Sequence, residues 1–307
     1  MDEYVKGPAP DRWHWIKNCS QYPRETVQKH LTRPSSDLCD ECQDIEKRAH
    51  IVVDLSRFKE VKEIMSRDIV TIAPEATMAE AARIMGEKHI GSLIVIKWET
   101  PVGIVTERDL LSKVIAPGKD IINEKVYDAM SYPLIAISPS AKIKEAAQMM
   151  TQKKGRLSVF DVGKLVGIIT AADLIRSLPD VPETEVKVDN FMTKQVEKID
   201  EKTSVADVAK LMGEKRIGSV IITRKGEPFG IFTERDLLTN FLVEGVSLNV
   251  EVGKETSEPL ITAYAGTSIH HAAVTMVMKH IRRLPITSNG EIVGIITARD
   301  LVEAYAK

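Results

Sequence analysis

The sequence predicts an α/β (α+β) fold built from four copies of one small β-α-β-β-α unit. Gly, two apolar residues and Thr-x-x-Asp-Leu occur together four times, and the threonines recur every 63 or 64 residues. A helix-period stripe and two strand-like runs precede each copy in the same order. A fixed period of this length indicates a repeat architecture. The motif pairs are Thr106 with Asp109, Thr170 with Asp173, Thr233 with Asp236, and Thr297 with Asp300.

Each predicted repeat opens with a short helical turn and a short extended stretch. The turns lie at 61–65, 126–130 and 188–192, and the extended stretches at 69–72, 134–137, 196–199 and 260–263. A full helix follows, because apolar residues at offsets 0, 3, 4 and 7 form one helix face. These apolar sets begin at Met78, Ile143, Val205 and Ile269. Thr77 with Glu80, and Ser204 with Asp207, predict capping boxes at two helix starts.

Two strands and a last helix complete each repeat. Paired apolar runs lie at 92–96 with 102–105, 157–160 with 165–169, 219–223 with 229–232, and 284–287 with 292–296. Polar turns between the runs, such as 288–291, are hairpin signals. The last helix is predicted to begin at Thr-x-x-Asp, which is itself a helix-capping pattern.

The four repeats also form a duplicated pair, A-B-A′-B′. Residues 84–111 and 211–238 align without a gap, and both contain Met-Gly-Glu-Lys, Ile-Gly-Ser and Thr-Glu-Arg-Asp-Leu-Leu. A unit of about 55 residues has a marginal core, so we expect the repeats to pair. The predicted domains are an N-terminal segment at 1–60 and repeats 1 to 4 at 61–118, 126–180, 188–245 and 250–307.

Composition limits the class of protein. The 307 residues are 43% apolar and 28% charged, as in a soluble globular protein. A net charge of −2 gives no support for bulk binding to nucleic acid or to an anionic membrane. No apolar run approaches the roughly 20 residues of a membrane helix, and a basic-then-apolar secretory layout is missing from the first residues, so we expect a cytoplasmic protein.

The repeated unit resembles the cystathionine β-synthase (CBS) domain, and the resemblance covers residues 61–307. It implies that two repeats pair around a pseudo-twofold axis as a Bateman module. Two such modules then pack as a disk, as in small archaeal and bacterial CBS-domain proteins and the γ subunit of AMP-activated protein kinase. The resemblance also implies clefts that bind AMP, ADP, ATP, S-adenosylmethionine or related thioadenosines, and a homodimer.

Thr-x-x-Asp has a structural and a functional interpretation. It caps a helix without any ligand. It also sets a hydroxyl and a carboxylate beside helix N-terminal amides, which favour phosphate, while an Asp can accept both ribose hydroxyls. By resemblance, the Asp holds ribose and the Thr holds ribose or phosphate. Arg108, Arg235 and Arg299 precede three of the aspartates; Ala172 precedes Asp173, which we therefore expect to hold phosphate least well.

Further candidates lie near the predicted strands. By resemblance, basic side chains before the second strand reach ligand phosphates, and Arg suits phosphate geometry. These residues are His89, Arg156, Arg216, His280, Arg282 and Arg283. Ser92 and Ser219 line the same cleft or permit tight packing, and Thr71 and Thr262 lie where the resemblance puts the adenine. Each of these residues is also compatible with an ordinary surface or strand role.

The N-terminal segment holds all three cysteines, and this odd number argues against a disulfide framework. His14, Cys19, Cys39 and Cys42 form two ligand pairs compatible with a tetrahedral zinc site. His30 or His50 can replace His14 in this set. The alternative is a tail whose thiols bind no metal and which packs on the repeats through Trp13 and Trp15.

The sequence contains no credible catalytic constellation, since Ser-His-Asp order, a Walker loop and His-Glu-x-x-His are missing. We therefore expect a non-catalytic sensor of an adenosyl ligand that signals by changed packing to an unknown protein partner. One alternative is a constitutive scaffold whose N-terminal segment docks a protein or a nucleic acid. Another is an enzyme acting on a bound nucleotide.

Overall fold

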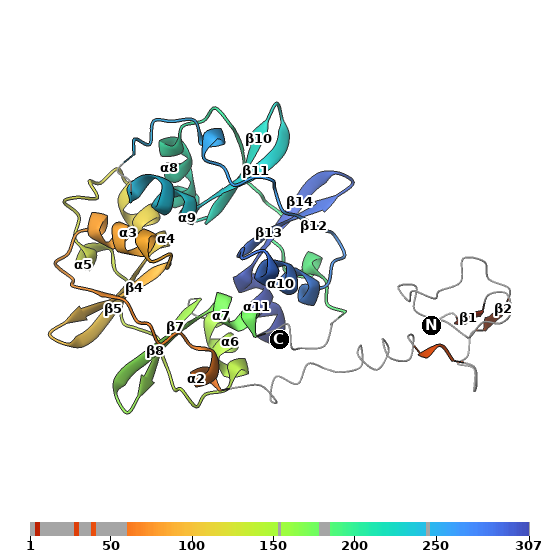
Figure 1. Cartoon of the computed structure of the whole chain (residues 1–307), viewed down its shortest axis with the longest axis horizontal. Coiled ribbons are helices and arrows are strands. Elements are labelled where there is room, and N and C mark those ends of the chain that lie inside the picture. The colour runs from red at the N-terminus through yellow and green to blue at the C-terminus, as the bar shows by residue number, and fades with distance from the viewer. Residues whose placement is uncertain are drawn as a thin grey trace.

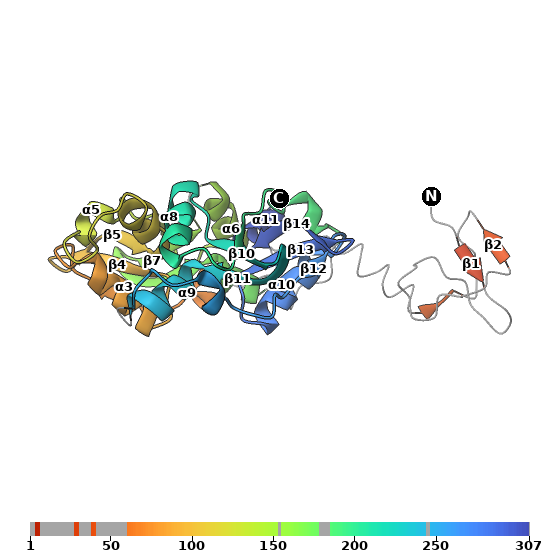
Figure 2. The same ribbon diagram turned by 90° about the horizontal axis from the view of Figure 1, so that it is seen from above.

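The protein is described by a computed structural model over residues 4–6, 28–30, 38–40, 60–152, 155–177, 185–243 and 246–306. Four repeats form a ring in Figure 1 and a flat disk in Figure 2, as predicted. Around the ring, repeat 1 (orange) is followed by repeat 3 (teal), repeat 4 (blue) and repeat 2 (green). Two short strands near the N-terminus, β1 (Tyr4–Lys6) and β2 (Gln28–His30), pair antiparallel.

Each repeat contains one three-stranded sheet with one parallel and one antiparallel strand pair. Repeat 1 has β3 (Thr71–Ile72), β4 (Ser92–Lys97) and β5 (Thr100–Thr106). Repeat 2 has β6 (Ala136–Ile137), β7 (Arg156–Asp161) and β8 (Lys164–Thr170). Repeat 3 has β9 (Lys198–Asp200), β10 (Ser219–Arg224) and β11 (Glu227–Thr233), and repeat 4 has β12 (Ala263–Tyr264), β13 (Arg283–Ser288) and β14 (Glu291–Thr297).

The amphipathic helices lie where the apolar stripes predict them. They are α3 (Met78–Glu87), α6 (Ile143–Gln152), α8 (Val205–Lys215) and α10 (Ile269–Met278). Every residue of the four stripes is buried, so this face supplies the core of each repeat. The hydroxyls of Thr77 and Ser204 accept hydrogen bonds from the backbone N–H three residues later, which confirms them as N-caps. The reciprocal bond from the Glu80 or Asp207 carboxylate to the cap backbone N–H is not formed, so only half of each predicted capping box is present.

The last helix of each repeat begins directly after the motif threonine. These helices are α4 (Glu107–Leu110), α7 (Ala171–Arg176), α9 (Glu234–Leu237) and α11 (Ala298–Ala306). In repeats 1 and 3 the chain continues as the π-helical turns η2 (Leu111–Ile115) and η5 (Leu238–Leu242). The odd and even repeats therefore differ in this helix, as the A-B-A′-B′ pattern predicts.

The short opening turns cross to the neighbouring repeat. The turn α2 (Val61–Ile64) lies on repeat 2, where Val61 N–H donates to the carbonyl of Ala141 at 2.9 Å. In exchange, α5 (Val126–Ala129) lies on repeat 1, where Val126 N–H donates to the carbonyl of Ala76 at 2.9 Å. Repeats 3 and 4 exchange η4 (Val188–Asn190) and η6 (Val252–Lys254) in the same way. Repeats 1 and 2, and repeats 3 and 4, are thus interlocked pairs.

The exchange of opening turns between paired repeats explains why the motif begins with glycine. A Cβ at Gly167 would lie 2.6 Å from the Met65 sulfur, and a Cβ at Gly103 would lie 2.8 Å from the Met130 sulfur. Real Cβ atoms do not approach this closely, so the strand needs glycine where the neighbour's turn crosses it. The same contact joins Gly294 to Met192, while Thr256 takes the place of Met beside Gly230.

Helices join the two interlocked pairs into one ring. A single apolar cluster contains buried residues of repeats 2 and 4, including Met150 and Leu301. Leu238 of repeat 3 belongs to the core of repeat 1, and Leu111 of repeat 1 belongs to the core of repeat 3. Repeat 1 therefore packs on repeat 3, and repeat 2 on repeat 4, with the motif helices close to the centre.

Candidate functional site

The four Thr-x-x-Asp motifs share one local geometry. In each, the threonine backbone N–H donates to Asp Oδ2 at 2.7 to 3.0 Å, and the threonine hydroxyl donates to the same oxygen at 2.6 to 2.8 Å. This arrangement is a capping box, so the structural interpretation of the motif holds at every copy. It uses one carboxylate oxygen and leaves Oδ1 for other partners.

The partners of Oδ1 divide the motifs into two classes. In repeat 1, Lys113 Nζ lies 2.8 Å from Asp109 Oδ1, and Ser131 Oγ donates to the same atom at 3.2 Å. In repeat 2, the Arg176 guanidinium pairs with Asp173 Oδ1. Both of these aspartates are buried, and their second oxygen is already neutralised by a cation.

Repeats 3 and 4 leave this oxygen more available. Ser257 Oγ donates to Asp236 Oδ1 at 3.3 Å. Within the described part of the chain, no Lys or Arg lies within salt-bridge distance of Asp236 or Asp300. Burial raises the pKa of both carboxyl groups, and the hydrogen bonds from Thr233 and Thr297 oppose that rise. These two carboxylates are the ones that gain most from hydroxyl donors.

The residue opposite each motif threonine alternates between the repeats. Ser92 faces Thr106 and Ser219 faces Thr233 across their hairpins, whereas Arg156 faces Thr170 and Arg283 faces Thr297. The predicted serine and arginine positions are therefore structurally equivalent. The odd repeats place a small hydroxyl beside the motif, and the even repeats place a guanidinium there.

Two buried glutamates hold arginines at the junction of the repeats. Glu107 and Glu234 follow the motif threonines of repeats 1 and 3, and their side chains are 5% and 7% exposed. Arg235 Nη2 lies 3.2 Å from Glu107 Oε1, and Arg108 Nε lies 3.3 Å from Glu234 Oε1. The two pairs are reciprocal, so they tie repeat 1 to repeat 3 on both sides of their pseudo-twofold axis.

The even repeats add further arginines to this junction. Arg283 Nη2 lies 2.8 Å from Glu234 Oε2, and Arg156 Nη2 donates to the Gly91 carbonyl at 3.0 Å. We use the name central cluster for Glu107 and Glu234 with the five arginines around them, Arg108, Arg156, Arg235, Arg282 and Arg283. The central cluster contains five guanidinium groups and two carboxylates, an excess of positive charge that Asp236, near Arg283, partly offsets.

Arg282 is the exceptional member of the central cluster. It is partly buried, and among the described residues no side chain makes an ion pair or hydrogen bond with its guanidinium. Burial lowers the pKa of Arg282 to about 10; the charge of nearby Glu107 opposes this shift, while Arg235, Arg283 and Arg156 add to it. A buried cation without a bonded counter-charge is unfavourable, and an anionic ligand would relieve it.

Other predicted site residues lie outside the central cluster. Arg216 is the C-cap of α8, and His89 lies just beyond the C-cap of α3. Both have left-handed backbones, with φ values of 54° and 52°, and both are exposed. The His89 carbonyl accepts a hydrogen bond from Arg235 Nη1 at 2.8 Å. Thr71, Thr262 and Arg299 are exposed as well, and their predicted contacts with adenine or phosphate stay predictions.

Sequence reasoning missed Glu107 and Glu234 as site residues. The signal was the alternation within the motif itself, because the odd repeats have Glu directly after the threonine while the even repeats have Ala171 and Ala298. A charged residue in a first helical turn normally faces solvent, so its burial became visible only once the repeats were assembled.

The predicted zinc site lies largely outside the described residues. His14, Cys19 and Cys42 are not among them, while Cys39 is described and buried. Within the described ranges, no three His, Cys, Asp or Glu side chains come together in a way that would hold a metal ion. The zinc hypothesis therefore stays a prediction.

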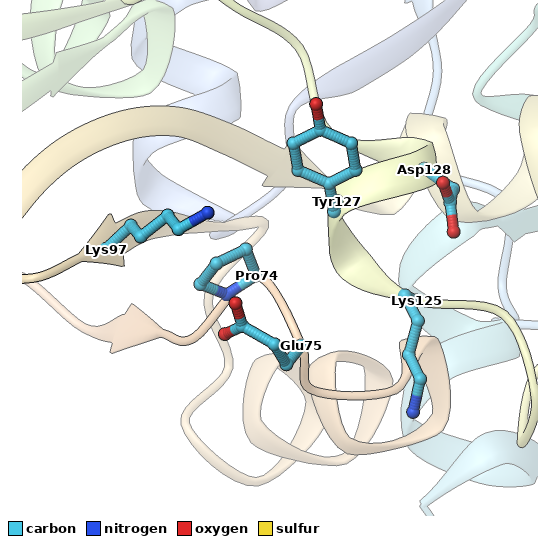
Figure 3. A pocket seen from close by; sticks show the side chains of 6 residues that line it. All are labelled: Pro74, Glu75, Lys97, Lys125, Tyr127 and Asp128. Carbon is cyan, nitrogen blue, oxygen red and sulfur yellow. The ribbon is translucent and has the colours of Figure 1, made fainter.

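A hollow on repeat 1 is distinct from all of these residues (Figure 3). Its cavity volume is about 320 Å³, and it is lined by Pro74, Glu75, Lys97, Lys125, Tyr127 and Asp128. Two acids and two bases line it together, so it has no excess charge to attract a phosphate. The exchanged turn α5 forms one wall, where Tyr127 N–H donates to the Pro74 carbonyl at 3.0 Å.

Comparison with protein families agrees with this architecture. The CBS domain model matches four times, at residues 61–116, 126–180, 188–242 and 251–307. The chain belongs to the CBS-domain family. CBS-domain proteins are generally regulatory and non-catalytic. In the described residues, no helix is both long and apolar enough to cross a membrane.

Several archaeal CBS proteins are similar to this chain. MJ1225 of Methanocaldococcus jannaschii is 28% identical over 276 residues, which is 80% of this chain and 98% of MJ1225. The crystal structure of MJ1225 matches 80% of this chain with a TM-score of 0.68 at 25% identity. MJ1225 itself has been proposed to be an archaeal homologue of g-AMPK. MJ1404 of the same organism is 30% identical over 266 residues, and MK0525 of Methanopyrus kandleri is 38% identical over 122 residues. The chain spans 62% of the length of each of these last two relatives.

Proposed function

We propose that this CBS-domain protein is a non-catalytic regulator that binds adenosyl nucleotides between its paired repeats, with the ligand phosphates directed to the central cluster. The observation that carries the proposal is Arg282, a partly buried guanidinium with no bonded counter-ion among the described residues. Phosphate oxygens would supply that counter-charge in the bidentate geometry that guanidinium groups favour. The similarity to MJ1225 supports the same class of function.

The ribose end of the ligand is assigned to Asp236 and Asp300. In both motifs Oδ2 serves the helix cap, and Oδ1 has no cationic partner among the described residues. A ribose diol can donate hydrogen bonds to such an oxygen, and bonds to a charged acceptor are stronger than neutral ones. Asp109 and Asp173 would first have to release Lys113 and Arg176, so repeats 3 and 4 are the favoured ligand pair.

Signalling would depend on the arginines that form ion pairs between different repeats. Arg108 and Arg235 each bridge repeat 1 and repeat 3, and Arg283 reaches from repeat 4 to repeat 3. A ligand that takes over these guanidinium groups changes the bonds between repeats. It shifts the packing equilibrium only as far as its affinity differs between the two packings. A partner protein or a second copy of the chain would read that change.

Binding is tested by thermal shift and by calorimetry on the full chain with AMP, ADP, ATP, S-adenosylmethionine and methylthioadenosine. A ligand at 100 times its Kd stabilises the fold by about 2.7 kcal/mol, which is a clear rise in Tm. Mass spectrometry of the purified protein identifies any ligand that co-purifies. If none of the five compounds shifts Tm at millimolar concentration, the nucleotide-binding proposal is wrong and a constitutive scaffold becomes the better explanation.

A further inference from the structure

The buried glutamates of the central cluster are not the carboxylates of the capping boxes; their side chains pair with arginines instead. Glu107 and Glu234 are among the few buried charged side chains of the described chain, and each faces arginines from other repeats. Burying a carboxylate is unfavourable unless cations and hydrogen bonds compensate it. Their place at the repeat junction therefore depends on the arginines that also make the candidate phosphate site.

We propose that Glu107 and Glu234 are specificity-determining residues that stand in for ligand phosphates. Their carboxylates pair with the guanidinium groups of Arg108, Arg235 and Arg283. A phosphate that binds these arginines must displace a carboxylate or lie beside it. Each added phosphate is therefore opposed in repeats 1 and 3, whereas the adenosyl part of the ligand is not. This inference rests on the proposed nucleotide-binding function.

The neighbouring glycines provide independent support. A Cβ at Gly218 would lie 2.0 Å from Arg283 Nη2 and 2.9 Å from Glu234 Oε2. A Cβ at Gly91 would lie 2.7 Å from Glu107 Oε2 and 2.9 Å from Arg156 Nη2. Both glycines belong to the duplicated Ile-Gly-Ser, so the same backbone position in each odd repeat leaves space for a carboxylate and a guanidinium to meet.

The even repeats lack a carboxylate at this position. Ala171 and Ala298 occupy the positions equivalent to the two glutamates, and their methyl groups cannot compete for a guanidinium. The four repeats therefore contribute two carboxylates rather than four, and the central cluster keeps a positive excess. This balance would let phosphates bind, but with an affinity set by the competing carboxylates rather than by the arginines alone.

The double variant Glu107→Gln with Glu234→Gln tests the inference, because glutamine keeps the shape and removes the charge. Calorimetry on the full chain would measure Kd for ATP, for methylthioadenosine and for inorganic tripolyphosphate. We expect ATP and tripolyphosphate to bind about tenfold more tightly, while methylthioadenosine changes less than about twofold. Glu145→Gln, at an exposed position, is the matched control and should leave all three values unchanged.

The outcomes separate this inference from the proposed function. If the wild-type chain binds ATP and methylthioadenosine but the double variant shows the same ratio of their Kd values, or weaker ATP binding, the glutamates only position the arginines and the inference is wrong. If no adenosyl ligand binds wild type but tripolyphosphate binds the double variant more tightly, the competition is supported and the proposed function fails. Should the double variant not fold, each single variant is expected to tighten tripolyphosphate binding about threefold, and no change in either single variant overturns the inference.

Discussion

Replacing Asp236 with Asn separates ribose binding from helix capping. Asn keeps an oxygen that can accept from the Thr233 N–H and hydroxyl, which now lie 2.7 and 2.8 Å from Asp236 Oδ2. It removes a carboxylate whose pKa is raised by burial, so the charged form is disfavoured in the fold and no stabilising charge is lost. We therefore expect the free energy of unfolding to change by less than about 1 kcal/mol. Hydrogen bonds from ribose to a charged oxygen contribute roughly 1.5–3 kcal/mol, so AMP should bind about 10- to 150-fold more weakly.

Calorimetry with AMP and 2′-deoxy-AMP on both proteins completes this test as a double-mutant cycle. Wild type should bind the deoxy ligand more weakly than AMP, and Asp236→Asn should nearly abolish that difference. Asp207→Asn is the matched control, because Ser204 and Asp207 form the same kind of capping contact at the exposed start of α8. If Asp236→Asn binds both ligands as wild type does, Asp236 is a cap and nothing more.

Three further outcomes are expected. Met65→Ala should lower the free energy of unfolding by about 2–3 kcal/mol in chemical denaturation, since Met65 is 8% exposed and fills the core shared with repeat 2, whereas Met278→Ala, at a position 73% exposed, should change it by less than about 0.5 kcal/mol. Arg282→Gln should raise the Tm of the ligand-free protein, because it removes a poorly compensated cation, yet weaken ATP binding about tenfold by calorimetry; a lower Tm would contradict this reasoning. The raised pKa of Asp300 means that the fold binds its proton more tightly than the unfolded chain does, so stability falls as pH rises from the ordinary Asp value through the raised one. As pH rises from about 4, the Tm of Asp300→Asn relative to wild type should therefore increase, and a difference independent of pH would refute this.

Local structure followed closely from the sequence. The apolar stripe that begins at Met78 forms one face of α3, and all of its residues are buried. The prediction succeeded because apolar residues at helical spacing lie on the face that packs against the core. The extended stretch predicted at 69–72 shortened to Thr71–Ile72, because only these residues pair with β4. Thr77 and Ser204 are N-caps, which is half of the predicted capping boxes, since this bond depends on residues only three positions apart.

The candidate site was less predictable. The Thr-x-x-Asp motifs were visible in the sequence, but there only the two residues between Thr and Asp distinguish the copies. Lys113 pairs with Asp109, while Asn240 occupies the equivalent position in repeat 3 and leaves Asp236 without that cation. The Glu/Ala alternation after the threonine marks Glu107 and Glu234, but their bonds span 126 to 128 residues for two arginines and 49 for a third, so no local pattern identifies these partners.

The sequence by itself determined four repeats, their order of elements, the A-B-A′-B′ duplication and the caps, because each depends on residues a few positions apart or on a fixed period. Tertiary structure decided which repeat each opening turn covers, which repeats pack by their helices, and which carboxylates stay available at the centre. The physical reason is that these features depend on contacts between surfaces that all four repeats present in nearly the same form. Close approaches, such as that of the Met65 side chain to Gly167, then determine which of these similar surfaces pack together.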